Sequence, residues 1–400
     1  MIQPKLRFKA DDGSAFSDWE KEKFGNFITT HSEKTSDKEK YPLYSLTIES
    51  GVQPKTERYE REFLVKKEGD NYKIVPPNGF VYNPMNLRFG ALKVNHEKFA
   101  VSVSGYYDVF SLKNESTLAF WENYLITPKM LQYYYSIATG SLIEKLRVHY
   151  SQFTEITKKI PSLPEQQKIA DFLSAIDTII EKQQATVKAW EQRKKGVMQK
   201  LFNQEVRFKA DDGSDFPDWE EKRFGDIVKE FKEKTTIENE DTLLSCAIDG
   251  IYLNSELFGH QRGQSNIGYL KIKQGTLILS AQNLHLGNVN VNMRFKHGII
   301  SPAYKTYEIV GCNVKYMNQW VKWDKTKQFF YNATTVGASG CRRNVDWMLL
   351  YQQVLKLPSP LEQQKIADCL SALDDVIKKQ KETLEKWKEL KKGLLQQMFV

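Results

Sequence analysis

The residues best suited to chemistry in this 400-residue chain are basic and amide side chains that gather between residues 245 and 345. This stretch holds twelve Lys and Arg but only four Asp and Glu, an excess equal to the +8 net charge of the whole chain. Asn, Gln, Ser and Tyr are interleaved with these cations. Cations bind DNA phosphates, whereas amides and hydroxyls can read base edges. The combination predicts a surface that binds duplex DNA.

Residues 28–159 carry a smaller excess, with eighteen basic against fifteen acidic residues. Candidate contacts in this block include Lys66, Lys67, Lys98 and the tyrosines at 133–135. For any single lysine the alternative is a solvated strand edge. The pattern in both blocks together indicates DNA binding more strongly than any one residue does.

The sequence lacks the signatures of an enzyme that acts alone. It has no phosphate loop, no dinucleotide-binding fingerprint, no H-E-x-x-H and no G-x-S-x-G. The six histidines are dispersed, and the four cysteines show no C-x-x-C spacing. We therefore expect no catalytic residue, no metal site and no cofactor bound by this chain. No apolar run is long enough for a membrane span or a signal peptide, which predicts a cytoplasmic protein.

The chain repeats itself. The segment Leu6–Trp19 returns at 206–219, and the segment 160–171 returns at 357–368. Residues 160–202 and 357–399 share 23 identities in 43 positions. The chain thus alternates variable blocks, whose two copies differ in sequence, with constant blocks, whose two copies are alike. This order predicts recognition domains at 1–159 and 206–356 and helical regions at 160–205 and 357–400.

The helical segment returns after 197 residues, from 160 to 357, and a faint pattern links the two variable blocks at this same offset. Asn86–Gly90 corresponds to Asn283–Gly287, and Ser104 and Tyr107 correspond to Ser301 and Tyr304. The two blocks are expected to share one fold and to carry different surfaces. For His285 a plain surface role is the alternative to reading bases. The candidate DNA-binding residues are Asn86, Arg88, Lys93, Ser104, Tyr107, Gln282, Asn283, His285, Asn288, Ser301, Tyr304, Arg342 and Arg343.

Each constant block predicts one long amphipathic helix, because its apolar residues recur at intervals of three and four. The first runs from Glu165 to Phe202, and at about 1.5 Å per residue it reaches roughly 57 Å. The simplest packing is an antiparallel coiled coil; the alternative is that each helix packs on its own domain. The predicted seam is Ile169, Leu173, Ile176, Ile180, Gln183, Val187, Trp190, Ile366, Leu370, Leu373, Ile377, Gln380, Leu384 and Trp387.

The variable blocks read as mixed strands and short helices. Strands are predicted at 99–103, 106–112, 275–279, 287–291 and 304–310, and helices at 117–125 and 318–330. The predicted fold class is α+β, with two globular domains in a pseudo-twofold arrangement separated by two long antiparallel helices.

The motif Leu163–Ser174, repeated at 361–371 and followed each time by a long helix, resembles the specificity subunit of type I restriction–modification enzymes. The segments 138–141 and 336–340 also resemble the glycine–serine stretch that closes each target-recognition domain of that family. The resemblance implies a non-catalytic subunit that binds double-stranded DNA. Each recognition domain would read one half of an asymmetric bipartite site, and the helices would set the gap between the halves.

The resemblance also implies partners and cofactors. Two modification subunits would bind S-adenosylmethionine, and two restriction subunits would use ATP and Mg. One alternative is an adaptor whose helices scaffold proteins and whose variable blocks bind peptides. Another is a stand-alone methyltransferase or nuclease with an unrecognised site. Binding that requires duplex DNA and weakens steeply with salt distinguishes the specificity subunit from the adaptor.

Overall fold

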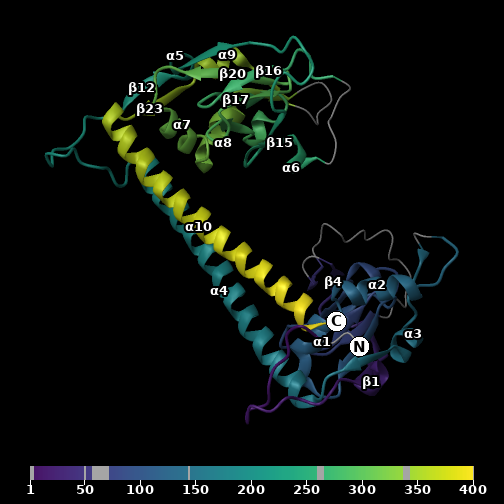
Figure 1. The fold of residues 1–400 in the computed structure, drawn as a ribbon. Helices are drawn as coiled ribbons and strands as arrows, with labels where there is room; N and C mark the ends of the chain where they lie inside the picture. The colour runs from purple at the N-terminus through teal and green to yellow at the C-terminus, as the bar shows by residue number, and fades with distance from the viewer. Residues whose placement is uncertain are drawn as a thin grey trace. The chain divides into compact units, whose positions relative to one another are not determined.

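The computed structural model describes residues 4–48, 51–55, 72–142, 145–258, 265–336 and 343–399 (Figure 1). The chain divides into two compact units. Unit 1 is Met1–Gln184 with Thr383–Val400, and unit 2 is Ala185–Glu382. Both units mix helices and antiparallel strands, so the predicted α+β class is confirmed. Lys66, Lys67, Arg342 and residues 337–340 lie outside the described residues.

The domain of unit 1 is built on a four-stranded antiparallel sheet with strand order β2-β10-β7-β8. Phe80 and Phe110 stack in its core with ring centres 4.9 Å apart, and Trp121 is buried beside them. The elements are β1 (Glu20–Lys23), β2 (Ile28–His31), β3 (Lys34–Thr35), β4 (Tyr44–Thr47), β5 (Gly51–Pro54), β6 (Tyr72–Val75), β7 (Phe80–Tyr82), η4 (Leu87–Phe89), β8 (Leu92–Val94), β9 (Val101–Val103), β10 (Asp108–Leu112), α1 (Leu118–Tyr124), α2 (Pro128–Ile137), α3 (Tyr150–Glu155) and β11 (Thr157–Ile160).

Unit 2 repeats this plan with the strand order β13-β20-β17-β18. Strands β7 and β8 correspond to β17 and β18 at the 197-residue offset, so the expected common fold of the two blocks is confirmed. The elements are β12 (Glu220–Arg223), α5 (Phe224–Ile227), β13 (Val228–Phe231), β14 (Leu244–Ala247), β15 (Gly250–Leu253), α6 (Asn254–Leu257), β16 (Leu270–Lys273), β17 (Leu277–Ser280), η7 (Leu284–Leu286), β18 (Val289–Val291), β19 (His297–Ile300), β20 (Tyr304–Ile309), α7 (Val314–Trp320), α8 (Asp324–Asn332), β21 (Thr334–Val336), β22 (Arg343–Val345), α9 (Trp347–Gln352) and β23 (Val354–Leu357).

The single helix predicted at 318–330 is wrong, because the chain forms two helices there, α7 and α8. Helix α7 ends at Trp320, and Trp323 caps the start of α8 with an extended backbone. The Trp320 carbonyl accepts from the Trp323 amide at 3.1 Å and from the Thr326 hydroxyl at 2.6 Å, and these bonds hold the break between the two helices. Both halves bury apolar residues at helical spacing, which hides the break from the sequence pattern.

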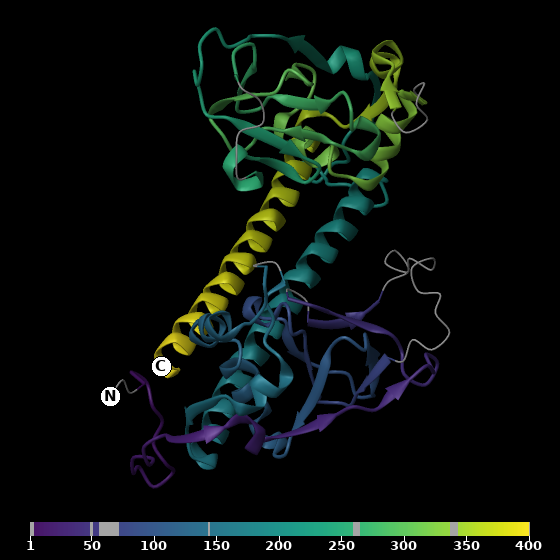
Figure 2. The same ribbon diagram turned by 90° about the vertical axis from the view of Figure 1, so that its right-hand side faces the viewer.

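Two long helices, α4 (Leu163–Phe202) and α10 (Pro360–Met398), contribute to both units. Figure 2 shows them as uninterrupted coils, and Gly196 and Gly393 lie within them. In unit 2, Lys194 pairs with Asp374 and Glu191 pairs with Lys381, both at 2.6 Å. Residue numbers fall on one helix as they rise on the other, so the pairing within this unit is antiparallel.

The predicted seam residues are all buried or half-buried. Ile169 and Leu173 belong to the core of unit 1, and Ile366 and Leu370 to the core of unit 2. The first turns of each helix therefore pack on a domain. The buried set is Ile169, Leu173, Ile176, Val187, Ile366, Leu370, Ile377 and Leu384, and the half-buried set is Ile180, Gln183, Trp190, Leu373, Gln380 and Trp387.

The last residues of each long helix also enter a domain core. Leu201 and Phe202 at the end of α4 are buried in unit 2, and Met398 and Phe399 at the end of α10 are buried in unit 1. Each domain core thus includes the start of one long helix and the end of the other. Within each unit, both long helices are therefore anchored in the domain core.

Candidate nucleic-acid interface

The repeated Glu-Gln-Gln-Lys motif anchors the start of each long helix. In unit 1 the Arg7 guanidinium donates to both carboxylate oxygens of Glu165, at 3.0 and 2.8 Å, and the Trp19 indole donates to the same carboxylate at 3.1 Å. The Glu165 side chain is fully buried. Its hydrogen bond raises the pKa of Arg7. The motif therefore has an architectural role.

The glutamine after this glutamate has a structural role as well. The Gln166 amide donates to the Pro161 carbonyl at 2.8 Å, and the Gln363 amide donates to the Pro358 carbonyl at the same distance. These bonds hold the strand that enters each helix against its first turn. Through these bonds the motif positions each domain on its long helix.

The predicted Asn-Leu-x-x-Gly segments form the same tight turn in both units. The Gly90 and Ala91 amides donate to the Leu87 and Asn86 carbonyls at 2.8 and 3.1 Å. The matching bonds in unit 2, from Gly287 and Asn288 to Leu284 and Asn283, measure 2.9 and 3.2 Å. Gly90 and Gly287 have φ of +90° and +85°, a conformation that glycine adopts without strain.

The Ser-x-x-Tyr segments form a second repeated turn. The Tyr107 amide donates to the Ser104 carbonyl at 3.0 Å, and the Tyr304 amide donates to the Ser301 carbonyl at 3.2 Å. Strand pairing sets Tyr82 opposite Asp108 and Ser280 opposite Tyr304. Each unit therefore brings its two turns to one edge of its main sheet.

In unit 1 this edge presents polar and aromatic side chains. Asn86 and Ser104 are exposed, and Tyr107 is half-buried, which raises its pKa. Arg88 donates to the Leu146 carbonyl at 3.3 Å and is half-buried. Lys93 lies on β8 itself, opposite Val81, and not in either turn.

Among the predicted residues of this edge in unit 2, Gln282 and Asn283 are exposed, and His285 and Ser301 are half-buried. Asn288 is buried, and its amide points to the Cys246 carbonyl at 3.5 Å. Tyr304 is half-buried and donates to that carbonyl at 2.9 Å. Asn288 and Tyr304 therefore fasten the β14–β15 hairpin to the edge.

Arg343 lies on β22 and is held by its own domain. Its guanidinium donates to the Thr334 hydroxyl and carbonyl, both at 2.7 Å, and covers the Tyr331 ring at 4.1 Å. Its predicted partner Arg342 lies outside the described residues. The two turns do not include Arg343, although α8, which carries Tyr331, packs against η7.

Sequence reasoning missed Phe89 and Lys327 at these edges, whereas Tyr135 belongs to the tyrosine group that it named. Phe89 is 54% exposed at the tip of the first turn, and the Arg88 guanidinium lies 4.7 Å from its ring centre. Tyr135 is also exposed and lies 6.0 Å from the same guanidinium. Lys327 of α8 is exposed and covers Gly287 with its aliphatic stem. The sequence feature that could have identified Phe89 is an apolar residue at the fourth position of the Asn-Leu-x-x-Gly pattern.

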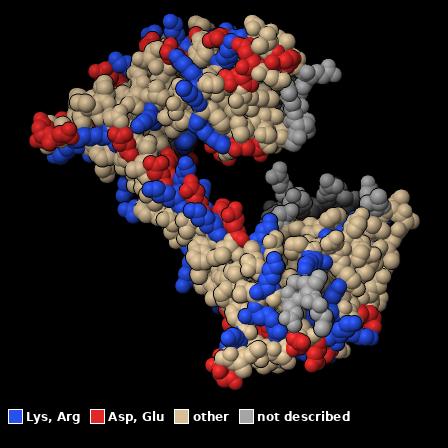
Figure 3. All heavy atoms as spheres, in the orientation of Figure 1, with Lys and Arg blue, Asp and Glu red and all other residues tan. Residues whose placement is uncertain are grey.

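The basic excess of residues 245–345 is partly neutralised by acids from outside that stretch. Lys305 pairs with Glu230 at 3.0 Å, and Lys271 pairs with Glu233 at 3.3 Å and also with Glu240. Figure 3 shows Lys and Arg on the displayed face of each unit, interspersed with Asp and Glu. The count of basic residues therefore overstates the charge available to a ligand.

The described part of the chain contains no cluster of three His, Cys, Asp or Glu side chains that could hold a metal ion. Burial raises the pKa of the Cys246 thiol to about 12, which keeps it protonated and unreactive. Among the described helices none is long and apolar enough to cross a membrane.

Comparisons with known proteins agree with this architecture. Residues 17–189 match the family model of the type I restriction modification DNA specificity domain. The chain is 27% identical over 267 residues to the type I restriction enzyme MjaVIII specificity subunit of Methanocaldococcus jannaschii. That match covers 61% of this chain and 62% of the relative, which is less than two thirds of the relative's length.

Solved structures show the same fold. The type I restriction–modification S subunit from M. genitalium aligns with a TM-score of 0.53 and 14% identity, over 100% of this chain and 99% of that one. A structure that concerns complex assembly and conformational transition of the type I restriction–modification system aligns at 0.51 and 14%, over 96% and 97%. With the internal repeat and the repeated helix-anchoring motif, these matches make the chain similar to the type I restriction–modification specificity subunits, and residues 17–189 match their DNA specificity domain.

Proposed function

We propose that this chain selects the DNA site of a type I restriction–modification complex. The observation that supports this most directly is the repeated sheet edge. Two turns with the same backbone hydrogen bonds present Asn86 and Arg88 in unit 1 but Asn283 and His285 in unit 2. One scaffold with two different polar surfaces suits two domains that each read a different half of an asymmetric bipartite site.

The long helices then set the gap between the half-sites and offer a surface for partner subunits. In this proposal they form an antiparallel coiled coil, and at about 1.5 Å per residue each helix reaches roughly 60 Å, or about 1.7 turns of DNA. Two modification subunits bind S-adenosylmethionine, and two restriction subunits use ATP and Mg. This chain is the non-catalytic member of the assembly and acts on DNA in the cytoplasm.

The test is to co-express the chain with a modification subunit, supply S-adenosylmethionine and map methylated adenines across a genome. We expect one bipartite motif, methylated on both strands. A stable complex that methylates no defined motif contradicts the proposal and favours the protein-binding adaptor.

A further inference from the structure

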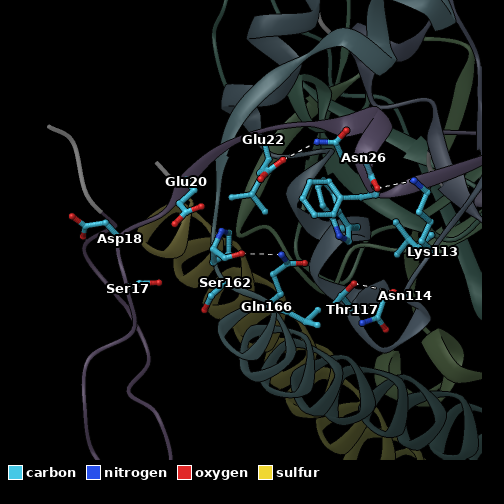
Figure 4. Close-up of a pocket in the computed structure, with 16 residues that line it drawn as sticks. Ser17, Asp18, Glu20, Glu22, Asn26, Lys113, Asn114, Thr117, Ser162 and Gln166 are labelled. Carbon is cyan, nitrogen blue, oxygen red and sulfur yellow. Dashed lines mark hydrogen bonds between the residues drawn. The ribbon is translucent and has the colours of Figure 1, made fainter.

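A cavity of about 370 Å³ lies in unit 1 beside the start of α4 (Figure 4). Its walls come from the segment that leads into β1, from β11 and from the turn between β10 and α1. Each of these elements belongs to unit 1. The cavity lies at the opposite end of β10 from the Ser-x-x-Tyr turn, because Leu112 ends this strand and Asp108 begins it.

The floor of the cavity is apolar, and its rim is acidic. Phe27, Trp121 and Ile160 line the floor. The acidic side chains of Asp18, Glu20 and Glu22 line the rim (Figure 4). The rim also has one cation, Lys113, whose ammonium group donates to the Asn26 carbonyl at 2.9 Å.

Gln166 gives the cavity a buried acceptor. Its side chain is 3% exposed and lines the cavity, and its amide nitrogen is occupied by the Pro161 carbonyl. Within the described ranges no protein group donates a hydrogen bond to its amide oxygen. Gln166 borders the cavity, so this oxygen can accept a hydrogen bond there and favours a ligand with N–H groups.

Unit 2 closes the corresponding position with its own chain. The Asn313 amide donates to the Gln363 oxygen at 2.8 Å, which occupies the acceptor that Gln166 leaves open. Lys222, at the position of Glu22, pairs with Glu220 at 2.9 Å. The same scaffold is thus filled and neutralised in one unit but open and acidic in the other.

We propose that this cavity binds an arginine side chain of a protein partner, which under the proposed function is a modification subunit. A guanidinium offers five N–H donors, which suit the carboxylates of Glu20 and Glu22 and the Gln166 oxygen. Its aliphatic stem and planar head pack on the apolar and aromatic floor. A DNA phosphate is disfavoured, because the carboxylates of Glu20 and Glu22 repel it.

The test uses the full chain labelled with 5-fluorotryptophan and the probe N-acetyl-arginine amide. Trp121→Phe assigns the Trp121 resonance. We expect a saturable shift of this resonance with a Kd of about 1 mM, as befits one side chain. The neutral isostere N-acetyl-citrulline amide should produce no such shift. An absent shift with arginine, or an equal shift with citrulline, overturns the proposal.

Glu22→Lys introduces into unit 1 the lysine that unit 2 already uses, and it should abolish the shift. Lys222→Glu is the matched control and should leave the shift unchanged. Glu22 is half-buried on β1 and accepts a hydrogen bond from the Asn26 amide at 2.8 Å, so we expect the melting temperature to fall by about 2–4 °C while the chain still folds. If Glu22→Lys does not fold, Glu20→Gln replaces it, and a shift of undiminished size in that variant overturns the proposal.

The proposal rests on the proposed function only for the identity of the partner. Co-purification of a modification subunit should fall at least tenfold in Glu22→Lys. If arginine binds but that yield is unchanged, the assigned partner is wrong. Because the titration needs neither DNA nor partner, a failed methylation map refutes the proposed function and leaves the arginine site to be judged by its own result.

Discussion

Arg7 and Glu165 form a two-pronged ion pair across 158 residues of chain, and Arg207 and Glu362 repeat it with the same 3.0 and 2.8 Å distances. Each carboxylate is fully buried, and each arginine is about four-fifths buried. Removing one partner of a buried pair leaves an uncompensated charge. The pair therefore fixes where each long helix begins relative to its domain.

We expect Arg7→Met to destabilise unit 1 by about 3 kcal/mol, because the Glu165 carboxylate loses its two charged donors. Arg207→Met should cost unit 2 a similar amount. Lys168→Met is the control: it breaks the pair with Asp11, whose side chain is 98% exposed, and should cost less than about 0.5 kcal/mol. Urea unfolding followed by circular dichroism measures all three, and equal effects of Arg7→Met and Lys168→Met contradict the assignment.

The long helices were predictable because apolar spacing persists over about forty residues, and such periodicity is a local property. The two repeated turns were also predictable, since the offset of the repeat aligns them. The surroundings of their side chains were not, because these depend on contacts distant in sequence. Asn288 meets Cys246 of another hairpin, and Lys305 meets Glu230, 75 residues away.

Two groups of glycines should respond in opposite ways to alanine. Gly90 and Gly287 have positive φ, so Gly90→Ala and Gly287→Ala should cost at least about 1 kcal/mol. Gly196 and Gly393 lie in helices with open space around the missing Cβ, so alanine there should stabilise by roughly 0.5–1 kcal/mol. Thermal unfolding of the four single variants distinguishes the groups, and a stabilising Gly287→Ala is inconsistent with the turn described here.

Stability of unit 1 should depend on pH through His96, which lies 2.8 Å from the Glu122 carboxylate. This hydrogen bond, and then the charges of Glu122, Glu181 and Asp177, raise the pKa of His96. The imidazolium therefore stabilises the folded state fully below its unfolded pKa of about 6.5, and the effect disappears as pH rises through the raised folded value.

The melting temperature of wild type should thus exceed that of His96→Gln at pH 5.5 by more than it does at pH 8.5. Glu122→Gln removes the main cause of the shift, and on that background His96→Gln should have nearly the same effect at both pH values. A difference between wild type and His96→Gln that grows with pH contradicts the ion pair.

Exchange of residues 28–159 for the corresponding block of another specificity subunit should change one half-site of the methylated motif. Insertion of one heptad in each long helix should lengthen the spacer by about three base pairs, because seven residues add about 10 Å and the half-sites stay with their domains. Methylation mapping reads both results. A block exchange that alters both half-sites contradicts the modular proposal, and an unchanged spacer contradicts the role of the helices.

The two units differ in how the chain passes from a long helix to the next β-hairpin. In unit 2 the Val206 amide donates to the Lys200 carbonyl at 3.3 Å, and residues 203–205 join the two segments covalently. In unit 1 the Leu6 amide donates to the Gln397 carbonyl at 3.1 Å, which is the same relationship, because Leu6 corresponds to Val206 and Gln397 to Lys200 in the repeat. The hairpin that starts at Leu6 therefore follows α10 in space as the hairpin that starts at Val206 follows α4.

A permuted chain should consequently fold to the same structure. It would start at Glu205, run to Phe399, continue through an Asn-Gln-Glu linker into Leu6 and end at Gln204. Permutation succeeds where the opened backbone is exposed and few contacts cross it, and residues 203–205 are exposed. We expect its unfolding free energy to lie within about 1 kcal/mol of wild type, since the linker replaces a loop of equal length.

A chain opened instead between Gln183 and Gln184 interrupts α4 and should lose several kcal/mol, because the helix hydrogen bonds across the cut and the packing of Val187 depend on continuity. Equal stability of the two permuted chains is the result that contradicts this equivalence of the two junctions.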